Sequence, residues 1–440
     1  MASPETGRGR ACRRVRLWRF FGHFVLEKVA HAPTRISRHG LEELMPRGIK
    51  TTIIGLIGAT LISSSALAGG FSRGTANLDG LYADGFELYS GLTFVSPGRS
   101  YENIVGTLGA SADQTFAEDY YVPYVSFGGK LVGDLSCVGS YTQPYGAKST
   151  YEGLLRFDTA ARDFVVDEYG LTCAYGADLG RGTAYLIGGA FYEALDYFEA
   201  QDFSVGPLSG GGQAPGESTL NMTSEAWGFR IGAAYEIPEI ALRASVIYRS
   251  QTVHDASGMY NNVPFAAIAA GRLWDPTPYV GMFSAGASAQ ATLPQSLEIN
   301  LRSGIAPGWL AFGSIKWTDW SVLQSLVVVE EIDGAEWSDS DFFFKDGWTV
   351  SGGIAHQFNN EFGGSVSVTW DKGVTSGYDT LSDTWTVATG VRYAKDNIAI
   401  SAGGAAIYFT EAAKTLGDDY TATSPGEWGY ALSLSGSVKF

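Results

Sequence analysis

The sequence predicts an all-β protein, namely a transmembrane antiparallel β-barrel of about 14 strands with a short N-terminal plug. Three observations predict this class. An export signal precedes the main part of the chain, amphipathic segments with a period of two recur along it, and the last of these segments ends on Phe440. Together they favour a barrel in the outer membrane of a Gram-negative cell.

The composition favours strands over helices and excludes several classes of protein. The 440 residues include 57 glycines, 13% are aromatic and only 17% are charged, which favours strands and tight turns. No segment after residue 70 contains the roughly 18 apolar residues that a membrane-spanning helix needs. A net charge of −16 argues against nucleic acid as a partner.

The N-terminal part of the chain contains the pattern of a secretory signal peptide, which we place at residues 45–68. Arg47 and Lys50 form a basic start, residues 51–62 are apolar, and an Ala-Leu-Ala sequence at 66–68 is a small-residue cleavage site. We therefore expect the mature chain to begin at Gly69.

The segments on either side of this signal are given different roles. Residues 1–44 are rich in arginine and fit no export signal, so we interpret them as translation from an upstream start codon, with a genuine long leader as the alternative. Residues 69–85 precede the first predicted strand. They are expected to enter the lumen as a short plug through Phe71, Asn77 and Leu78, so that the barrel occupies residues 86–440.

The barrel strands are predicted from alternation, which is most regular at the C-terminus. There Tyr430, Leu432 and Leu434 alternate with Ala431, Ser433 and Ser435, which gives one apolar face and one small or polar face. The aromatic end at Phe440 is expected to contact the barrel assembly machinery. The fourteen predicted strands are 86–96, 120–129, 131–142, 163–178, 181–199, 222–236, 239–256, 285–303, 307–325, 343–358, 361–371, 382–395, 398–410 and 425–440.

Short and long connections alternate between these strands, as periplasmic turns and outer loops do in outer-membrane barrels. The short connections are predicted at 129–130, 178–181, 236–239, 303–307, 358–361 and 395–397. Cys137 and Cys173 fall on strands, and the oxidising periplasm would permit a disulfide, but their positions leave the pairing open. The loop 330–341 carries six acidic residues. It is interpreted as a solvated acidic loop, with a calcium site as the alternative.

The predicted lumen contains two features that could contact a ligand. Alternation turns four arginines inward, where they could hold a carboxylate or form internal ion pairs that stiffen the barrel; these are Arg230, Arg243, Arg249 and Arg302. The strand 307–325 is apolar on both faces, and Leu310, Phe312 and Trp320 are expected on its ligand face. A place in the interfacial aromatic girdle is the alternative for Trp320.

The search for catalytic chemistry yields little. His254-Asp255 is similar to the Asp-His pair of outer-membrane proteases, but one adjacent pair is weak evidence and a residue at the barrel rim is the alternative. No nucleophile elbow, zinc spacing or phosphate-binding loop occurs. We therefore expect no enzyme, no cofactor and no metal.

Several segments resemble the long-chain fatty acid transporter family of the FadL/OmpP1/TodX type. The similarity is clearest in Leu-Pro-Gln-Ser at 293–296, followed by Trp-Thr-Asp-Trp-Ser at 317–321. Tyr-Arg-Ser at 248–250 with His254 and Gly258, and Lys-Asp-Gly-Trp at 345–348, are also similar to family segments. The resemblance covers the second half of the chain and is weak before residue 240. It lacks the family's longer plug with an Asn-Pro-Ala element and has only Asn77-Leu78-Asp79.

This resemblance implies a fourteen-stranded barrel with an N-terminal plug that takes up hydrophobic compounds passively. The expected partners are fatty acids and similar small molecules, together with outer-membrane lipid and lipopolysaccharide. Such cargo would enter from outside, meet apolar sites and leave sideways through a gap in the barrel wall. A general diffusion porin for small polar solutes is the alternative, although the doubly apolar strand 307–325 speaks against it.

Overall fold

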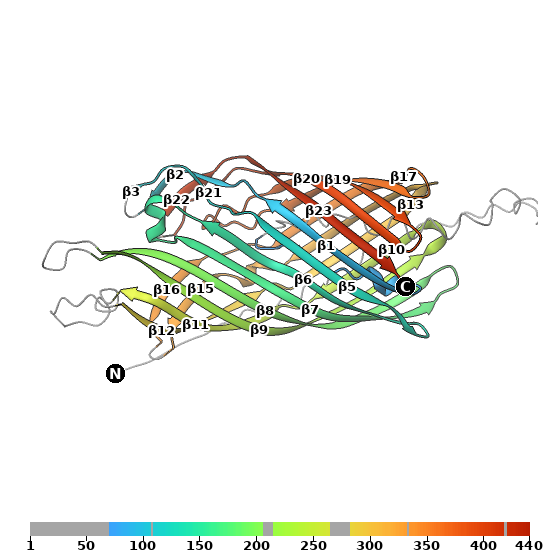
Figure 1. Cartoon of the computed structure of the whole chain (residues 1–440), viewed down its shortest axis with the longest axis horizontal. Helices are drawn as coiled ribbons and strands as arrows, with labels where there is room; N and C mark the ends of the chain where they lie inside the picture. The colour runs from blue at the N-terminus through green and yellow to red at the C-terminus, as the bar shows by residue number, and fades with distance from the viewer. Residues whose placement is uncertain (1–69, 107–108, 206–213, 265–281, 332–333, 418–419) are drawn as a thin grey trace, which may run out of the picture. The chain divides into compact units, whose positions relative to one another are not determined.

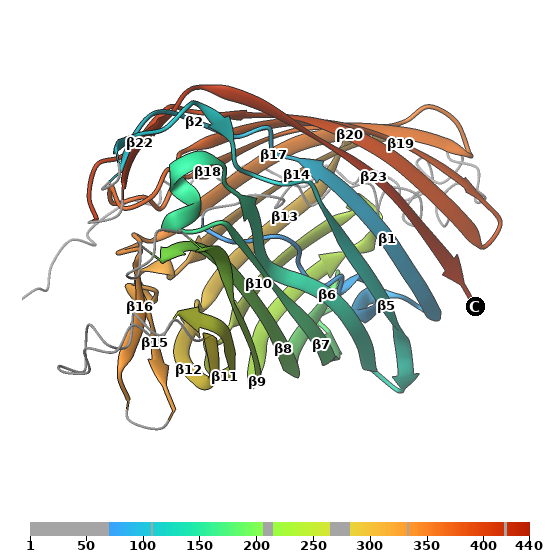
Figure 2. The same ribbon diagram turned by 60° about the vertical axis from the view of Figure 1, so that its left-hand side comes forward.

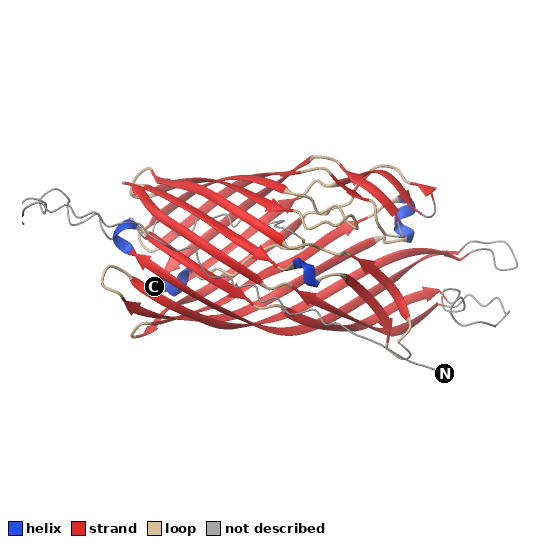
Figure 3. Ribbon diagram, turned by 180° about the vertical axis from the view of Figure 1, so that it is seen from behind, coloured by secondary structure: helices blue, strands red, loops and turns tan. Residues whose placement is uncertain are grey.

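Most of the chain forms one antiparallel β-sheet. The computed structural model describes residues 70–440 apart from 107–108, 206–213, 265–281, 332–333 and 418–419 (Figure 1). The predicted leader at 1–44 and the predicted signal peptide at 45–68 lie outside the described residues. Strands dominate the described part of the chain, and its helices are four short 3-10 turns (Figure 3). None of the helices in this part is long and apolar enough to cross a membrane.

The sheet has fourteen strand positions, as the sequence predicts. Ten of them are single strands: β1 (Phe86–Ser96), β5 (Tyr120–Val132), β6 (Leu135–Thr150), β7 (Ala161–Asp178), β8 (Thr183–Val205), β9 (Ala214–Ile237), β18 (Phe362–Lys372), β19 (Thr384–Lys395), β20 (Ile398–Phe409) and β23 (Glu427–Lys439). The other four each consist of an inner and an outer piece: β10 (Leu242–Arg249) with β11 (Thr252–Pro264), β13 (Ser296–Ala306) with β12 (Met282–Leu293), β14 (Trp309–Thr318) with β15 (Ser325–Glu330), and β17 (Gly347–Gln357) with β16 (Glu336–Asp341).

The sheet closes because its first strand pairs on both sides. β1 pairs with β5 from Phe86↔Gly129 onward and with β23 from Glu87↔Lys439 onward. The amide of Phe440 donates to the carbonyl of Phe86, which places both ends of the barrel at the same edge. The tight turns, such as Asp396-Asn397, lie at this edge as well. It is therefore the periplasmic edge, as predicted.

Alternation sorts the side chains of each strand between lipid and lumen. On β23, Tyr430 and Leu432 are 51% and 57% exposed, whereas the intervening Ala431 is 3% exposed. A strand side chain that is exposed and apolar in a barrel faces lipid, and its neighbour faces the lumen. The same pattern places Val125 and Phe127 of β5 on the outer surface.

The four two-piece strands are interrupted at one common level. Arg249, Ser296, Thr318 and Gly347 lie directly opposite one another across β10, β13, β14 and β17, and they form the last rung of the inner pieces. Pro294, which has no N–H to donate, lies between β12 and β13. The 3-10 turn η4 (Trp320–Val322) separates β14 from β15. The outer pieces pair with one another, β11 with β12, β12 with β15 and β15 with β16, toward the end opposite the C-terminus (Figures 1 and 2).

Several sequence-based boundaries are wrong. The turn predicted at 129–130 lies at Gly133-Asp134, because β5 continues to Val132 and only Gly133 adopts the positive φ of 56° that the turn needs. The predicted strands 181–199 and 222–236 are too short. β8 and β9 have 23 and 24 residues, so they extend beyond the roughly 10 residues that cross a bilayer, into a region where polar side chains occupy both faces.

A smaller sheet lies within two of the predicted outer loops. It combines β2 (Ser100–Gly106), β3 (Gly109–Ala110) and β4 (Gln114–Thr115) from the first loop with β21 (Ala412–Lys414) and β22 (Tyr420–Ser424) from the last. The rings of Tyr101 and Phe116 stack with their centroids 4.0 Å apart beneath it. The outer loops next to the first and last barrel strands are thus joined in one sheet, in addition to the pairing of these two strands in the barrel wall.

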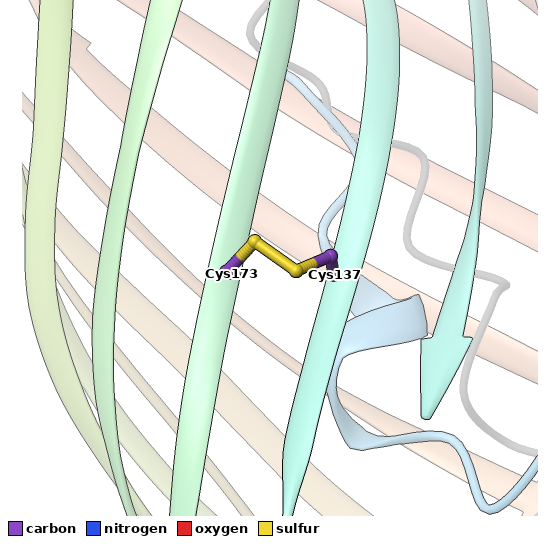
Figure 4. The surroundings of a disulfide bond; sticks show 2 residues. All are labelled: Cys137 and Cys173. Carbon is purple, nitrogen blue, oxygen red and sulfur yellow. A yellow bond between two sulfur atoms is a disulfide. The ribbon is translucent and has the colours of Figure 1, made fainter. Parts of the chain in front are cut away.

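Cys137 and Cys173 form a disulfide between β6 and β7 (Figure 4). They are directly opposite each other, with Cα atoms 4.0 Å apart. Both alternate with buried residues, Val138 and Ala174, and therefore lie on the outer face of the barrel. The sequence left this pairing open, because it does not determine the register of neighbouring strands.

Candidate functional site

The N-terminal segment 70–85 lies inside the barrel and contacts it in two places. Near the periplasmic edge, the 3-10 turn η1 (Asp79–Tyr82) buries Leu81 completely against inward-facing Val138 and Ile187. Arg243 of β10 pairs with Asp79 at 3.0 Å, and its guanidinium lies 3.7 Å from the centre of the Tyr82 ring. This part of the segment therefore fills the periplasmic end of the lumen.

The other contact is with an interruption in the barrel wall. Pairing between β5 and β6 stops at Tyr124↔Thr142. It resumes at Ala117↔Ser149, just before the start of β5. Between these points the amides of Arg73 and Gly74 donate to the carbonyls of Pro144 and Gln143, both at 2.8 Å. The N-terminal segment thus takes the place of β5 along this part of β6.

Two glycines allow this close approach. A Cβ on Gly74 would lie 2.8 Å from the Thr142 hydroxyl, and a Cβ on Gly146 would lie 2.6 Å from the Arg73 guanidinium carbon. Arg73 in turn lies over the ring of Tyr120, 4.3 Å from its centre. The interruption is therefore covered from the lumen side by residues 71–74 and is not covered by a neighbouring strand.

A cavity of about 670 Å³ lies beside this interruption, toward the outer end of the lumen. Phe71, Ser72, Gly146 and Ala147 line it on the side of the wall interruption. Its outer part is lined by charged side chains that include Arg99, Glu118, Lys148, Arg162, Asp339 and Lys414. Its inner part is lined by apolar side chains that include Phe164, Leu195, Met222, Leu293 and Phe344.

The order of side chains along β7 and β8 explains this division. Arg162 and Glu199 are directly opposite and form an ion pair at 3.1 Å. One step of two residues toward the periplasmic end, Phe164 is opposite Tyr197. The next pair that faces the lumen is Val166 and Leu195. A step of two residues advances about 7 Å along a strand. The lumen-facing positions on the two strands therefore change from charged to apolar over about 7 Å.

The apolar part of the cavity belongs to the largest buried apolar cluster of the described residues. Phe71 packs edge-on against Phe164 and Trp320, with centroids 5.0 and 6.0 Å apart, and against Phe344 at 5.5 Å. Trp320 is fully buried at the centre of this cluster. A place for Trp320 in the interfacial girdle is therefore wrong.

A buried group of charged side chains lies one step further toward the periplasmic end, and we call it the inner ion cluster. Arg230 pairs with Glu168, and Arg249 pairs with both Glu168 and Glu193, with an Arg249–Glu168 distance of 3.1 Å. The two carboxylates are 1% and 0% exposed. Thr252 and His254 donate to Glu193 as well, with Oγ1 and Nε2 at 2.6 and 3.2 Å from Oε2.

The four predicted arginines all face the lumen but do not form one group. Arg230 and Arg249 belong to the inner ion cluster, whereas Arg243 and Arg302 meet Glu236 near the periplasmic edge at 2.9 and 3.8 Å. Their guanidinium groups contact protein carboxylates, which is the internal ion-pair arrangement that the sequence left open. The cavity lining contains none of the four among the described residues.

The other predicted site residues are placed in different regions. Leu310 is buried and Phe312 half-buried on β14, on the inner side of the strand interruptions and away from the cavity. Phe71 lines the cavity. Asn77 accepts a hydrogen bond from the Asp79 amide at 3.0 Å, and Leu78 packs in the cluster around Leu81.

The structure also brings together residues that the sequence analysis missed. Glu168 and Glu193 occupy inward-facing positions of predicted strands, so an acidic residue at a lumen position was a usable signal. Phe342 and Phe344 lie between β16 and β17. The predicted strand 343–358 includes Phe344, but β17 begins only at Gly347, so alternation along that strand does not apply to Phe344. The pair His254-Asp255 is not a catalytic dyad, because His254 contacts Glu193 whereas Asp255 accepts from Gln290 at 2.7 Å.

The predicted acidic loop at 330–341 is partly a strand, because Glu336–Asp341 forms β16, and its described residues show no metal centre. Asp339 and Asp341 lie on or beside the cavity mouth. Across the described part of the chain, no group of three or more His, Cys, Asp or Glu side chains gathers as metal ligands do.

Comparison with known proteins gives one family and several similar structures. A family model for the outer membrane protein transport protein (OMPP1/FadL/TodX) matches residues 82–413. A Pseudomonas aeruginosa FadL homologue superposes with a TM-score of 0.71 at 13% identity, over 84% of this chain and 100% of that one. The P. putida toluene transporter TodX gives 0.58 at 15% identity, over 81% and 90%. The CymD monoaromatic hydrocarbon channel gives 0.55 at 13% identity, over 86% and 98%. No curated protein matches by sequence.

Proposed function

Because the chain belongs to the outer membrane protein transport family (OMPP1/FadL/TodX), we propose that it carries long-chain fatty acids and similar hydrophobic molecules into its lumen cavity and releases them sideways through the barrel wall. Membership makes it a bacterial outer-membrane transporter of hydrophobic compounds and not an enzyme. The identity of the cargo and the exit route are the parts that we propose.

The observation that carries the proposal is the sequence of environments from the outer end inward. A charged mouth leads to an apolar chamber that contains Phe71, Phe164 and Phe344. Each 100 Å² of apolar surface removed from water is worth about 2.5 kcal/mol, so such a chamber holds an apolar solute that a water-filled pore would not. This supports a hydrophobic cargo over the general diffusion porin.

Two features support a sideways exit. The periplasmic end of the lumen is occupied by η1, with Leu81 fully buried. The cavity, by contrast, borders the interruption between β5 and β6, where only residues 71–74 lie between the chamber and the edge of β6. Movement of this short segment would open a route from the chamber into lipid, and an apolar solute would not need to cross water.

The charged mouth supports a fatty acid as cargo. Arg99, Lys148 and Lys414 line the outer part of the cavity, where a carboxylate could lie beside cationic groups while its tail enters the chamber. The structural relatives carry both FadL and toluene transporter in their descriptions, so aromatic hydrocarbons are the competing cargo. Direct binding of a carboxylate by the four predicted arginines stays a hypothesis.

The cargo is tested with purified protein in planar bilayers and in liposomes. We expect uptake of radiolabelled palmitate with little ion conductance. Large and stable open channels would instead establish a diffusion porin.

The exit route is tested by tethering the N-terminal segment to β6. Ser72 and Tyr145 are directly opposite, so cysteines at these two positions are placed like Cys137 and Cys173. Oxidation of the Ser72→Cys, Tyr145→Cys variant should stop palmitate uptake and reduction should restore it. Wild-type protein under the same two conditions is the control. Unchanged uptake in the oxidised variant would exclude this route.

A further inference from the structure

The inner ion cluster meets the cavity at one residue, His254. The side chain of His254 lines the cavity, whereas Glu168, Glu193 and Arg249 do not appear in its lining. The ring is fully buried, and its Nε2 lies 3.2 Å from Oε2 of Glu193. Among the described residues, no group forms a hydrogen bond with the other ring nitrogen, Nδ1. A buried polar atom without a partner is rare in folded proteins.

Glu193 determines which ring nitrogen of the neutral imidazole carries the hydrogen. A carboxylate can only accept, so Nε2 donates to Oε2 of Glu193, and Nδ1 of that tautomer presents a lone pair.

The carboxylate of Glu193 has further donors besides His254. Oε2 of Glu193 also accepts from Thr252, and Oε1 accepts from Arg249. The carboxylate is thus held on both oxygens, and the orientation of the His254 ring is fixed through it.

The neighbours of His254 in the cavity lining are small and apolar. Ala291 lies directly opposite on β12, and Ala256 and Ala289 follow on the outer side. All four residues line the cavity. The floor of the chamber is therefore formed by small apolar side chains and a hydrogen-bond acceptor.

We propose that Nδ1 of His254 accepts a hydrogen bond from a hydroxyl group of the cargo. The transporter then selects hydrophobic molecules that carry an O–H group over hydrocarbons and ethers of the same size. A phenol, a long-chain alcohol and a fatty acid in its protonated form all satisfy this requirement. A carboxylate does not, because it has no hydrogen to donate and would lie near Glu193. This inference rests on the proposed function and narrows its cargo.

Three matched ligands test it: 4-pentylphenol, its methyl ether 4-pentylanisole, and pentylbenzene. The three share ring and chain, and only the phenol can donate a hydrogen bond. Titration calorimetry on the folded barrel in micelles should give an affinity for the phenol about ten-fold above the other two. Equal affinities for phenol and ether in the wild-type protein overturn the inference. Absence of binding by all three overturns the proposed function as well.

Two variants locate the effect. His254→Phe keeps a planar ring without an acceptor, and it should abolish the preference, so that the phenol, the ether and pentylbenzene bind with equal affinity. Val253→Phe changes the adjacent, outward-facing residue, which is 44% exposed, and it should retain the preference. If folded His254→Phe still prefers the phenol, a group other than His254 causes the preference.

A spectroscopic measurement does not depend on any variant. Residues 70–440 contain two histidines, and Nδ1 of His356 lies 3.0 Å from the carbonyl of Gly308, to which it must donate. Nitrogen-15 NMR of histidine-labelled protein should therefore show one ring with a bare Nδ1 and one with a protonated Nδ1. Protonation of Nδ1 in both rings would contradict the acceptor role of His254.

Discussion

Replacing Arg249 with methionine should destabilise the barrel more than any other single arginine replacement among the four that the sequence singled out. Arg249 contacts both carboxylates of the inner ion cluster, the Tyr145 hydroxyl at 3.1 Å and the Pro294 carbonyl at 3.3 Å. Methionine fills a similar volume but leaves these acceptors without their cation.

The size of the effect follows from what remains in the cluster. Glu168 would keep Arg230, but Glu193 would keep only Thr252 and His254 and would stay fully buried with an uncompensated charge. Removing one partner of a buried ion pair costs about 3–5 kcal/mol. Arg302→Met is the matched control. Arg302 lies 3.8 Å from Glu236, which retains Arg243 at 2.9 Å, so the control should lose less than about 1 kcal/mol.

Urea unfolding in detergent micelles, followed by the heat-dependent shift in gel mobility, measures both variants. A loss for Arg249→Met no larger than that for Arg302→Met would refute the reasoning. The same proteins test the carboxylate hypothesis. We expect Arg249→Met to weaken palmitate and an uncharged alkane equally, whereas a selective loss of palmitate would make Arg249 a headgroup contact.

Three further outcomes are expected. N-terminal sequencing of the protein from outer membranes should begin at Gly69, and retention of Arg47 would refute the signal peptide. Deletion of Phe440, whose amide bonds to β1, should sharply reduce the amount in the outer membrane, and a normal, heat-shifted band would contradict this. Replacing Cys137 and Cys173 by serine should lower the free energy of unfolding in urea by about 2–4 kcal/mol, and an unchanged urea midpoint would show that the disulfide adds nothing.

The sequence predicts the barrel well because lipid and lumen impose a period of two on every membrane-crossing strand. The first predicted strand, 86–96, coincides with β1. Prediction fails where that constraint ends. The outer parts of β8 and β9 have polar residues on both faces, and the turn at Gly133 depends on a backbone conformation that neighbouring Gly129 could equally have supplied.

The candidate site was predicted less completely. Alternation correctly turned Arg230 and Arg249 inward, yet it could not pair them with Glu168 and Glu193, because pairing depends on the register between strands far apart in the sequence. The direction of Phe344 was not predicted, because the predicted strand 343–358 begins too early and the residue belongs to a connection between β16 and β17. What sequence patterns determine here is which face a residue occupies, and not its partner across the lumen.

The common level at which four strands are interrupted divides the barrel into a closed ring that inserts into the membrane and outer hairpins that line the cavity. Inside the rung through Arg249, Ser296, Thr318 and Gly347, every strand is tied to both neighbours in an unbroken ring. Outside that rung, the hairpins β11–β12 and β15–β16 pair with each other through β12 and β15, and they supply His254, Ala289 and Leu326 to the cavity. Mutations in these hairpins can reshape the chamber without disturbing the ring that inserts into the membrane. Evolution could therefore change the cargo of such a barrel while leaving its assembly intact.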